Sequence, residues 1–61
     1  MLYIVEKKFQ DSPWRFDGDY TERDAKFRAF ELTECYGYDT RVIYNGKIVY
    51  AYNSTKRRLR K

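Results

Sequence analysis

Apolar and polar side chains alternate along much of the first twenty residues, and this pattern predicts two β-strands. Residues 2–9 and 14–20 are rich in aromatic and β-branched side chains, and the turn-forming residues 10–13 separate them. The two segments are therefore predicted to form a hairpin. By alternation, the inward faces are predicted to carry Tyr3, Val5 and Phe9 in the first strand and Trp14, Phe16, Gly18 and Tyr20 in the second.

The next segment predicts a helix from Glu22 to Tyr36. Thr21, followed three positions later by Asp24, resembles a capping box, and Gly37 suits the left-handed conformation that ends a helix. Phe27 and Phe30 point away from the apolar stripe of this helix, which makes them candidates for a protein interface. The stripe itself, expected to face the core, consists of Ala25, Ala29, Leu32 and Tyr36.

A second hairpin is predicted around Asn45-Gly46, the residue pair that a type I′ turn favours. A two-residue turn pairs Ile43 with Ile48 and Arg41 with Tyr50. One face is expected under the helix and the other toward solvent or a partner. The first face consists of Thr40, Val42, Tyr44, Lys47, Val49 and Ala51, and the second of Asp39, Arg41, Ile43, Ile48, Tyr50 and Tyr52.

The predicted order of elements is ββαββ. One helix stripe and four strand faces are buried most simply when a single helix packs on a four-stranded antiparallel sheet, a two-layer α+β fold. We expect one domain over residues 1–53 and a basic C-terminal tail over residues 54–61. This layout resembles small accessory proteins that phages encode; the resemblance covers residues 1–53, rests on the layout, and implies no functional residue.

Composition argues against catalysis. Sixty-one residues leave little room for an enclosed active site, and the chain has no histidine and one cysteine, Cys35, expected to be partly buried. A disulfide within the chain and the usual zinc ligand sets are excluded. We expect no enzyme activity, cofactor or metal. Charged residues near the start and the lack of a long apolar run predict a cytoplasmic protein, in the host cytoplasm if a phage encodes it.

Positive charge is concentrated at the C-terminus. The chain has 13 Lys and Arg against 9 Asp and Glu, a net charge of +4, and five of the basic residues lie in residues 56–61. Residues 1–55 therefore keep eight basic and nine acidic side chains, a net charge of −1. An electrostatic partner is expected to meet mainly the five tail cations, Lys56, Arg57, Arg58, Arg60 and Lys61.

Two functions fit this pattern. In the first, the tail binds phosphates of DNA or RNA with a log-log salt slope of about −4 to −5, and Arg41, Tyr50 and Tyr52 offer a stacking surface. In the second, the chain is a protein-interaction module, either a homodimer or an inhibitor of a host protein. That interface would use Phe27, Phe30, Ile43 and Ile48. A solubilising role of the tail is the alternative to the first function.

Overall fold

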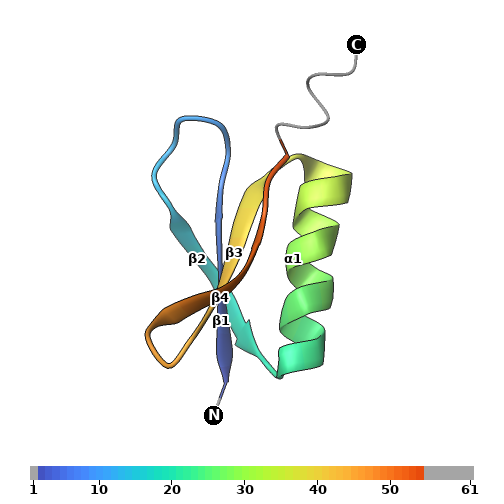
Figure 1. Ribbon diagram of the computed structural model, residues 1–61. Helices are drawn as coiled ribbons and strands as arrows, with labels where there is room; N and C mark the ends of the chain where they lie inside the picture. Colours follow the sequence, from blue (N-terminus) through green and yellow to red (C-terminus); the bar gives the residue numbers. More distant parts are fainter. Residues whose placement is uncertain (1, 55–61) are drawn as a thin grey trace.

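The computed structural model describes residues 2–54 and confirms the two-layer α+β fold (Figure 1). All strand pairs are antiparallel, and the strand order in the sheet is β2-β1-β3-β4. The helix covers one face of this sheet and leaves the opposite face open, which we call the open face. The elements are β1 (Tyr3–Lys8), β2 (Arg15–Tyr20), α1 (Glu22–Tyr36), β3 (Asp39–Tyr44) and β4 (Lys47–Tyr52).

Both ends of α1 are capped as predicted. The side chain of Thr21 accepts a hydrogen bond from the backbone N–H of Asp24, and Gly37 takes a left-handed conformation with φ of 78°. The backbone N–H of Gly37 donates to the carbonyl of Thr33, which satisfies one of the free carbonyls at the helix end. Local chemistry alone therefore sets where this helix begins and ends.

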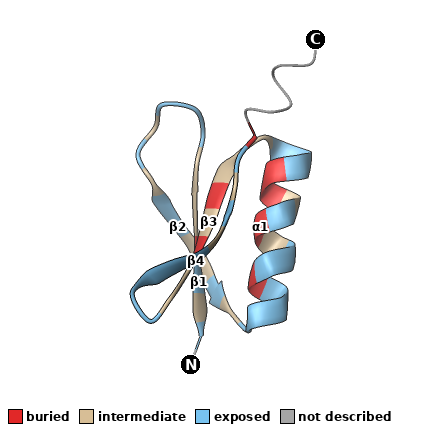
Figure 2. Cartoon of the chain, in the orientation of Figure 1, coloured by how far each residue is buried: buried red, intermediate tan, exposed pale blue. Residues whose placement is uncertain are grey.

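The core lies where α1 crosses the two central strands, β1 and β3 (Figure 2). Val5 and Val42 pair across these strands and are fully buried. The buried helix residues above them are Ala25, Ala29 and Leu32, as predicted. Small side chains let the helix approach closely enough for the Thr40 hydroxyl to donate to the carbonyl of Ala29 over 3.1 Å.

A β-bulge in β2 corrects the predicted face of the first hairpin. Val5 pairs with Gly18 and Glu6 pairs with Phe16, so Asp17 is an extra residue. The bulge interrupts the alternation: Tyr20 packs against the core, whereas Phe16 is 63% exposed. The prediction that Trp14 and Phe16 share the buried face with Gly18 and Tyr20 is wrong.

A second bulge in β4 corrects the register of the second hairpin. Asn45 and Gly46 have positive φ values of 57° and 76°, which confirms the predicted turn, and Ile43 pairs with Ile48. Beyond that pair the register shifts by one residue at Val49, so Val42 pairs with Tyr50 and Arg41 with Ala51. Tyr50 and Tyr52 therefore lie against the core on the helix side, and the predicted solvent-facing position of these two tyrosines is wrong. The same shift removes Val49 and Ala51 from the predicted helix side, and both are exposed.

Two other rings predicted to face inward are largely exposed. Phe9 is 47% exposed and makes an edge-to-face contact with Tyr38 at 5.8 Å, and Tyr36 is 58% exposed. Phe9 follows the last residue of β1, and Tyr36 is the last residue of α1. Both rings stand at the ends of their elements, where the opposite layer no longer covers them.

Candidate functional site

A network of polar side chains lies between β2 and α1, centred on Asp17. This carboxylate, with a side chain only 4% exposed, accepts hydrogen bonds from Lys7 at 3.0 Å, Arg28 at 3.0 Å and Tyr20 at 2.9 Å. Burial alone would raise the pKa of Asp17, but these three donors outweigh it, and the pKa lies below its ordinary value. The hydrogen bond to Asp17 raises the pKa of Arg28, and burial raises that of Tyr20. The network connects α1 to the sheet through Arg28, and each of its charged groups has a partner.

Gly18 makes room for this network. A Cβ atom at this position would lie 2.8 Å from the Tyr20 hydroxyl, so a larger residue would push that hydroxyl away from Asp17. Glycine inside a strand often marks a bulge or a close approach, and here it marks both. The Asp17-Gly18 pair was the signal in the sequence that could have located the first bulge.

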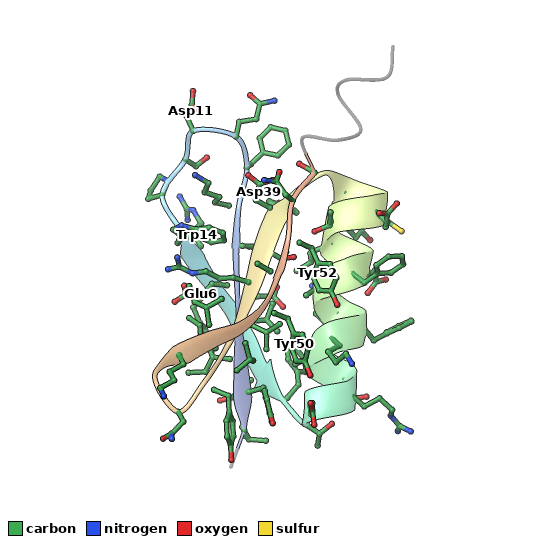
Figure 3. The ribbon with its side chains drawn as sticks, in the orientation of Figure 1. Glu6, Asp11, Trp14, Asp39, Tyr50 and Tyr52 are labelled. Atoms are coloured by element: carbon green, nitrogen blue, oxygen red, sulfur yellow. The ribbon has the colours of Figure 1, made fainter. Side chains whose placement is uncertain are left out.

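The open face carries a different cluster, centred on Trp14. The guanidinium carbon of Arg41 lies 4.1 Å from the centroid of the Trp14 ring, and the Lys8 ammonium lies 5.4 Å from it. Glu6 accepts a 2.7 Å hydrogen bond from Arg41 and holds the guanidinium over the ring. Figure 3 shows Glu6 and Trp14 on the side of the sheet away from α1. An aromatic ring with two cations suits a planar or anionic ligand.

These side chains line a hollow of about 360 Å³, which we call the Trp14 pocket. The hollow lies at the end of the sheet where β4 leads into Asn53 and Ser54. Ser54 is buried, and both its backbone N–H and its hydroxyl donate to Asp39, at 2.9 and 3.0 Å. The lining residues are Lys8, Trp14, Asp39, Thr40, Arg41, Ile48, Ala51, Tyr52 and Asn53.

The structure brings together only part of the predicted stacking surface. Arg41 and Tyr52 both line the Trp14 pocket, but the rings of Tyr50 and Tyr52 pack on the α1 side of the sheet (Figure 3). The Tyr50 hydroxyl donates to Glu22 over 2.7 Å, and this hydrogen bond raises the pKa of the tyrosine. The five predicted tail cations, residues 56–61 without Leu59, lie outside the described residues. Sequence reasoning missed Trp14 and Lys8 because it assigned Trp14 to the core.

The predicted protein-interface residues lie on two separate surfaces. Phe27 and Phe30 are exposed on the outer side of α1, 69% and 51% respectively. Ile48 is exposed on the open face and pairs with the half-buried Ile43. The helix and the sheet separate these two pairs, so they do not form one continuous interface.

Other site chemistry is limited in the described part of the chain. Within residues 2–54, no three acidic or cysteine side chains are grouped to hold a metal ion. Cys35 is exposed, so the prediction that it is partly buried is wrong: the residue stands on the last turn of α1, beyond the covered stripe. No helix in this part of the chain is long and apolar enough to cross a membrane.

The fold and these surfaces define a small α+β protein with a cation-flanked tryptophan on an open sheet face. Comparisons of the chain with protein-family models, with curated proteins and with solved structures found no match. The functional argument therefore rests on the chemistry of the two surfaces described above.

Proposed function

We propose that this protein is a non-catalytic module that binds single-stranded nucleic acid, DNA or RNA. In this proposal, bases stack in the Trp14 pocket and the basic segment 56–61 neutralises phosphates. The observation that carries it is the position of Trp14, which lies between two cations on the open face and next to the point where the chain leads into the basic segment.

The pocket supplies the groups that a stacked nucleotide needs. Proteins that bind single strands without sequence preference combine aromatic rings, on which bases stack, with cations along the backbone. Trp14 offers an indole ring that α1 does not cover, and Lys8 and Arg41 flank it. Lys8 has no ion pair with a carboxylate among residues 2–54, so its charge is available to a phosphate.

The basic segment supplies the charge that the rest of the chain lacks. Because residues 1–55 carry a net charge of −1, long-range attraction of phosphates must come from residues 56–61. The bonds between Ser54 and Asp39 hold Ser54, two residues before this segment, at the rim of the pocket. Six residues extend at most about 22 Å, so the segment and the pocket can contact the same short oligonucleotide.

Tryptophan fluorescence tests this proposal directly, because Trp14 is the only tryptophan in the chain. Oligo-dT and oligo-rU of about twelve nucleotides are titrated at low salt, with heparin as a polyanion without bases. We expect the oligonucleotides to quench Trp14 emission and heparin to bind without the same quenching. Five tail contacts predict a log-log salt slope of about −3.5 for a single strand.

Variants separate the two parts of the site, with anisotropy of a labelled oligonucleotide as the readout. Trp14→Leu is expected to weaken binding by about tenfold, from the loss of one stacked base. Tyr36→Leu, which removes an exposed ring at the end of α1, is the matched control. Replacing all five tail cations by glutamine is expected to remove most of the salt dependence. The proposal is wrong if no oligonucleotide binds at low salt, or if Trp14→Leu binds like the wild type.

A further inference from the structure

The outer side of α1 carries a stripe of exposed side chains. At about 100° per residue, Arg23, Phe27, Phe30 and Glu34 fall within an arc of about 60°, opposite the buried stripe. All four side chains are exposed. Their spacing of four, three and four residues is the spacing of positions that meet along the seam between two packed helices. We call these four residues the outer stripe.

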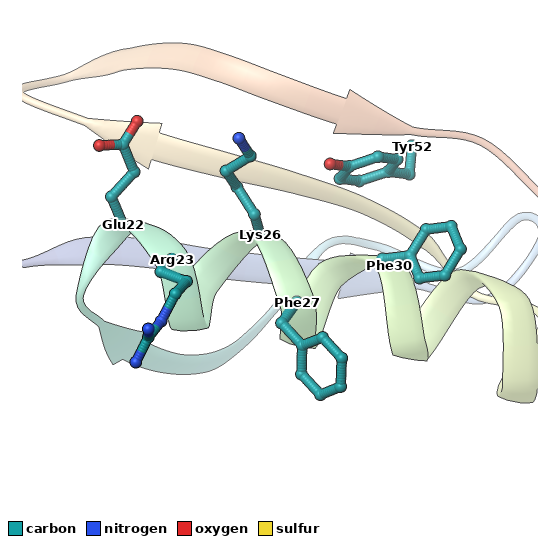
Figure 4. Close-up of a pocket in the computed structure, with 6 residues that line it drawn as sticks. All are labelled: Glu22, Arg23, Lys26, Phe27, Phe30 and Tyr52. Atoms are coloured by element: carbon teal, nitrogen blue, oxygen red, sulfur yellow. The ribbon is translucent and has the colours of Figure 1, made fainter.

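A groove runs beside the outer stripe, between α1 and β4 (Figure 4). Its volume is about 520 Å³, and the rings of Phe30 and Tyr52 meet there edge to face at 6.2 Å. Figure 4 shows Glu22 and Lys26 on the side of the helix nearer β4, and Phe27 and Arg23 farther from it; all four line the groove. The groove is wide enough to take an aromatic side chain from another molecule.

The order of residues along the outer stripe is complementary to itself. When two copies of α1 pack antiparallel about a two-fold axis between positions 28 and 29, each position i faces position 57 − i of the other copy. Phe27 then meets Phe30, and Arg23 meets Glu34 at each end of the contact. Parallel packing would instead place Arg23 beside Arg23 and Glu34 beside Glu34.

We propose that the outer stripe is the interface of a two-fold symmetric homodimer, in which Phe27 of each copy enters the groove of the other. Charge complementarity selects a second copy as the occupant, because the same stripe supplies both partners of each ion pair. One face of a 15-residue helix covers less area than a standard protein interface. We therefore expect a dimer with micromolar affinity. The outer stripe lies on α1, whereas Trp14 and its two cations lie on the open face, and the two hollows share only Tyr52 among their lining residues. Dimerisation and nucleic-acid binding can therefore fail independently.

Sedimentation over a range of about 1–500 µM tests the association of the full chain. The wild type is expected to shift from monomer to dimer mass across this range. Phe27→Ser is expected to stay monomeric at all concentrations, with an unchanged circular dichroism spectrum because Phe27 is 69% exposed. Phe16→Ser, the matched control on the open face, is expected to associate like the wild type. A monomeric wild type, or equal loss in both variants, overturns the proposal.

Charge reversal tests the antiparallel geometry specifically. Arg23→Glu and Glu34→Arg each create two repulsive pairs in a homodimer, and each is expected to weaken association by about tenfold. The double variant restores both attractive pairs and is expected to associate like the wild type. An equimolar mixture of the two single variants is expected to form a heterodimer. If the single variants associate like the wild type, or the mixture does not associate, the proposed pairing is wrong.

The exposed thiol of Cys35 provides an independent measure of whether the two helices run antiparallel or parallel. In the antiparallel dimer, the two copies of Cys35 are offset by thirteen residues along the helix axis, about 20 Å at 1.5 Å per residue. Spin labels on Cys35 are expected to report a distance of at least that length. A distance of about 10 Å or less indicates parallel packing and contradicts the proposal. Association only with an unrelated helical protein, with no self-association, contradicts it as well.

Discussion

The two faces of the sheet differ in how deeply they bury a carboxylate. Under α1, the Asp17 carboxylate is almost fully buried and three donors satisfy it. On the open face, Glu6 and Arg41 form an ion pair of similar length, 2.7 Å, but each side chain is about a quarter exposed. The cations are about equally exposed on both sides, so the difference lies in the carboxylate. Because water screens the buried Asp17 less, we expect its network to stabilise the fold more than the Glu6–Arg41 pair, which orients Arg41 over Trp14.

The two bulges decide which residues belong to each face. Both occur in edge strands, and both lie opposite a buried valine of a central strand, Val5 or Val42. Each bulge turns tyrosines toward the helix and leaves aliphatic or phenylalanine side chains outside. Bulges in edge strands also discourage pairing with other chains. The two register shifts, beside Val5 and Val42, therefore decide which side chains of the edge strands face the helix and which face outward.

The largest expected effect is the loss of the buried carboxylate. Asp17→Asn leaves Lys7 without its counter-ion and Arg28 with Glu31 alone, and we expect it to lower the free energy of unfolding by about 3 kcal/mol, measured in urea. This is a large part of the about 3–9 kcal/mol expected for 61 residues. Asp19→Asn, at an exposed position of the same strand, is the control and is expected to change stability by less than about 0.5 kcal/mol.

A milder variant covers the case in which Asp17→Asn does not fold. Tyr20→Phe removes only one donor to the carboxylate and is expected to cost about 1 kcal/mol. If neither substitution at Asp17 or Tyr20 changes stability more than Asp19→Asn does, the covered network does not hold the helix on the sheet.

Lowering the pH should remove the stabilising contribution of the Asp17 carboxylate without a mutation. The folded-state pKa of Asp17 is lowered, so its stabilising effect is complete above the ordinary value of about 3.9 and is lost as pH falls through the lowered folded value. Once the pH falls below the folded-state pKa, the protonated carboxyl resembles asparagine. Urea unfolding of the wild type and Asp17→Asn at pH 6 and pH 2 is therefore expected to show a difference that shrinks at low pH. A constant difference would contradict this assignment.

Apolar side chains provide the next comparison between the faces. Val42→Ala deletes methyl groups from the fully buried row under α1 and is expected to cost about 2 kcal/mol. Ile48→Ala deletes more atoms, but on the open face, where Ile48 is 56% exposed, and is expected to change stability by less than about 0.5 kcal/mol. Equal effects in urea unfolding would show that the open face contributes to the core.

Local signals predicted the elements, but not the faces of the edge strands. The Glu22–Tyr36 helix and the Asn45-Gly46 turn depend on caps and turn residues that lie next to each other in the chain, and both predictions are confirmed. Strand faces depend instead on strict alternation, and one extra residue reverses every position beyond it. The bulges at Asp17 and Val49 reverse the faces in both hairpins. Strict alternation, which ignores them, therefore wrongly predicted Trp14 in the core and Tyr50 on the exposed side.

The smallest expected effect concerns the Trp14 cluster itself. A double-mutant cycle of Trp14→Leu and Arg41→Gln measures the coupling between the ring and the guanidinium, and we expect about 0.5–1 kcal/mol, because the site is partly exposed. A parallel cycle with Lys26→Gln and Tyr50→Leu, a cation–ring contact of 4.8 Å on the helix side, is the control. A Trp14–Arg41 coupling of about 3 kcal/mol would mean that the cluster is a structural support of the fold. A small coupling leaves the ring and its two cations free to rearrange around a ligand, which is what a binding surface on the open face requires.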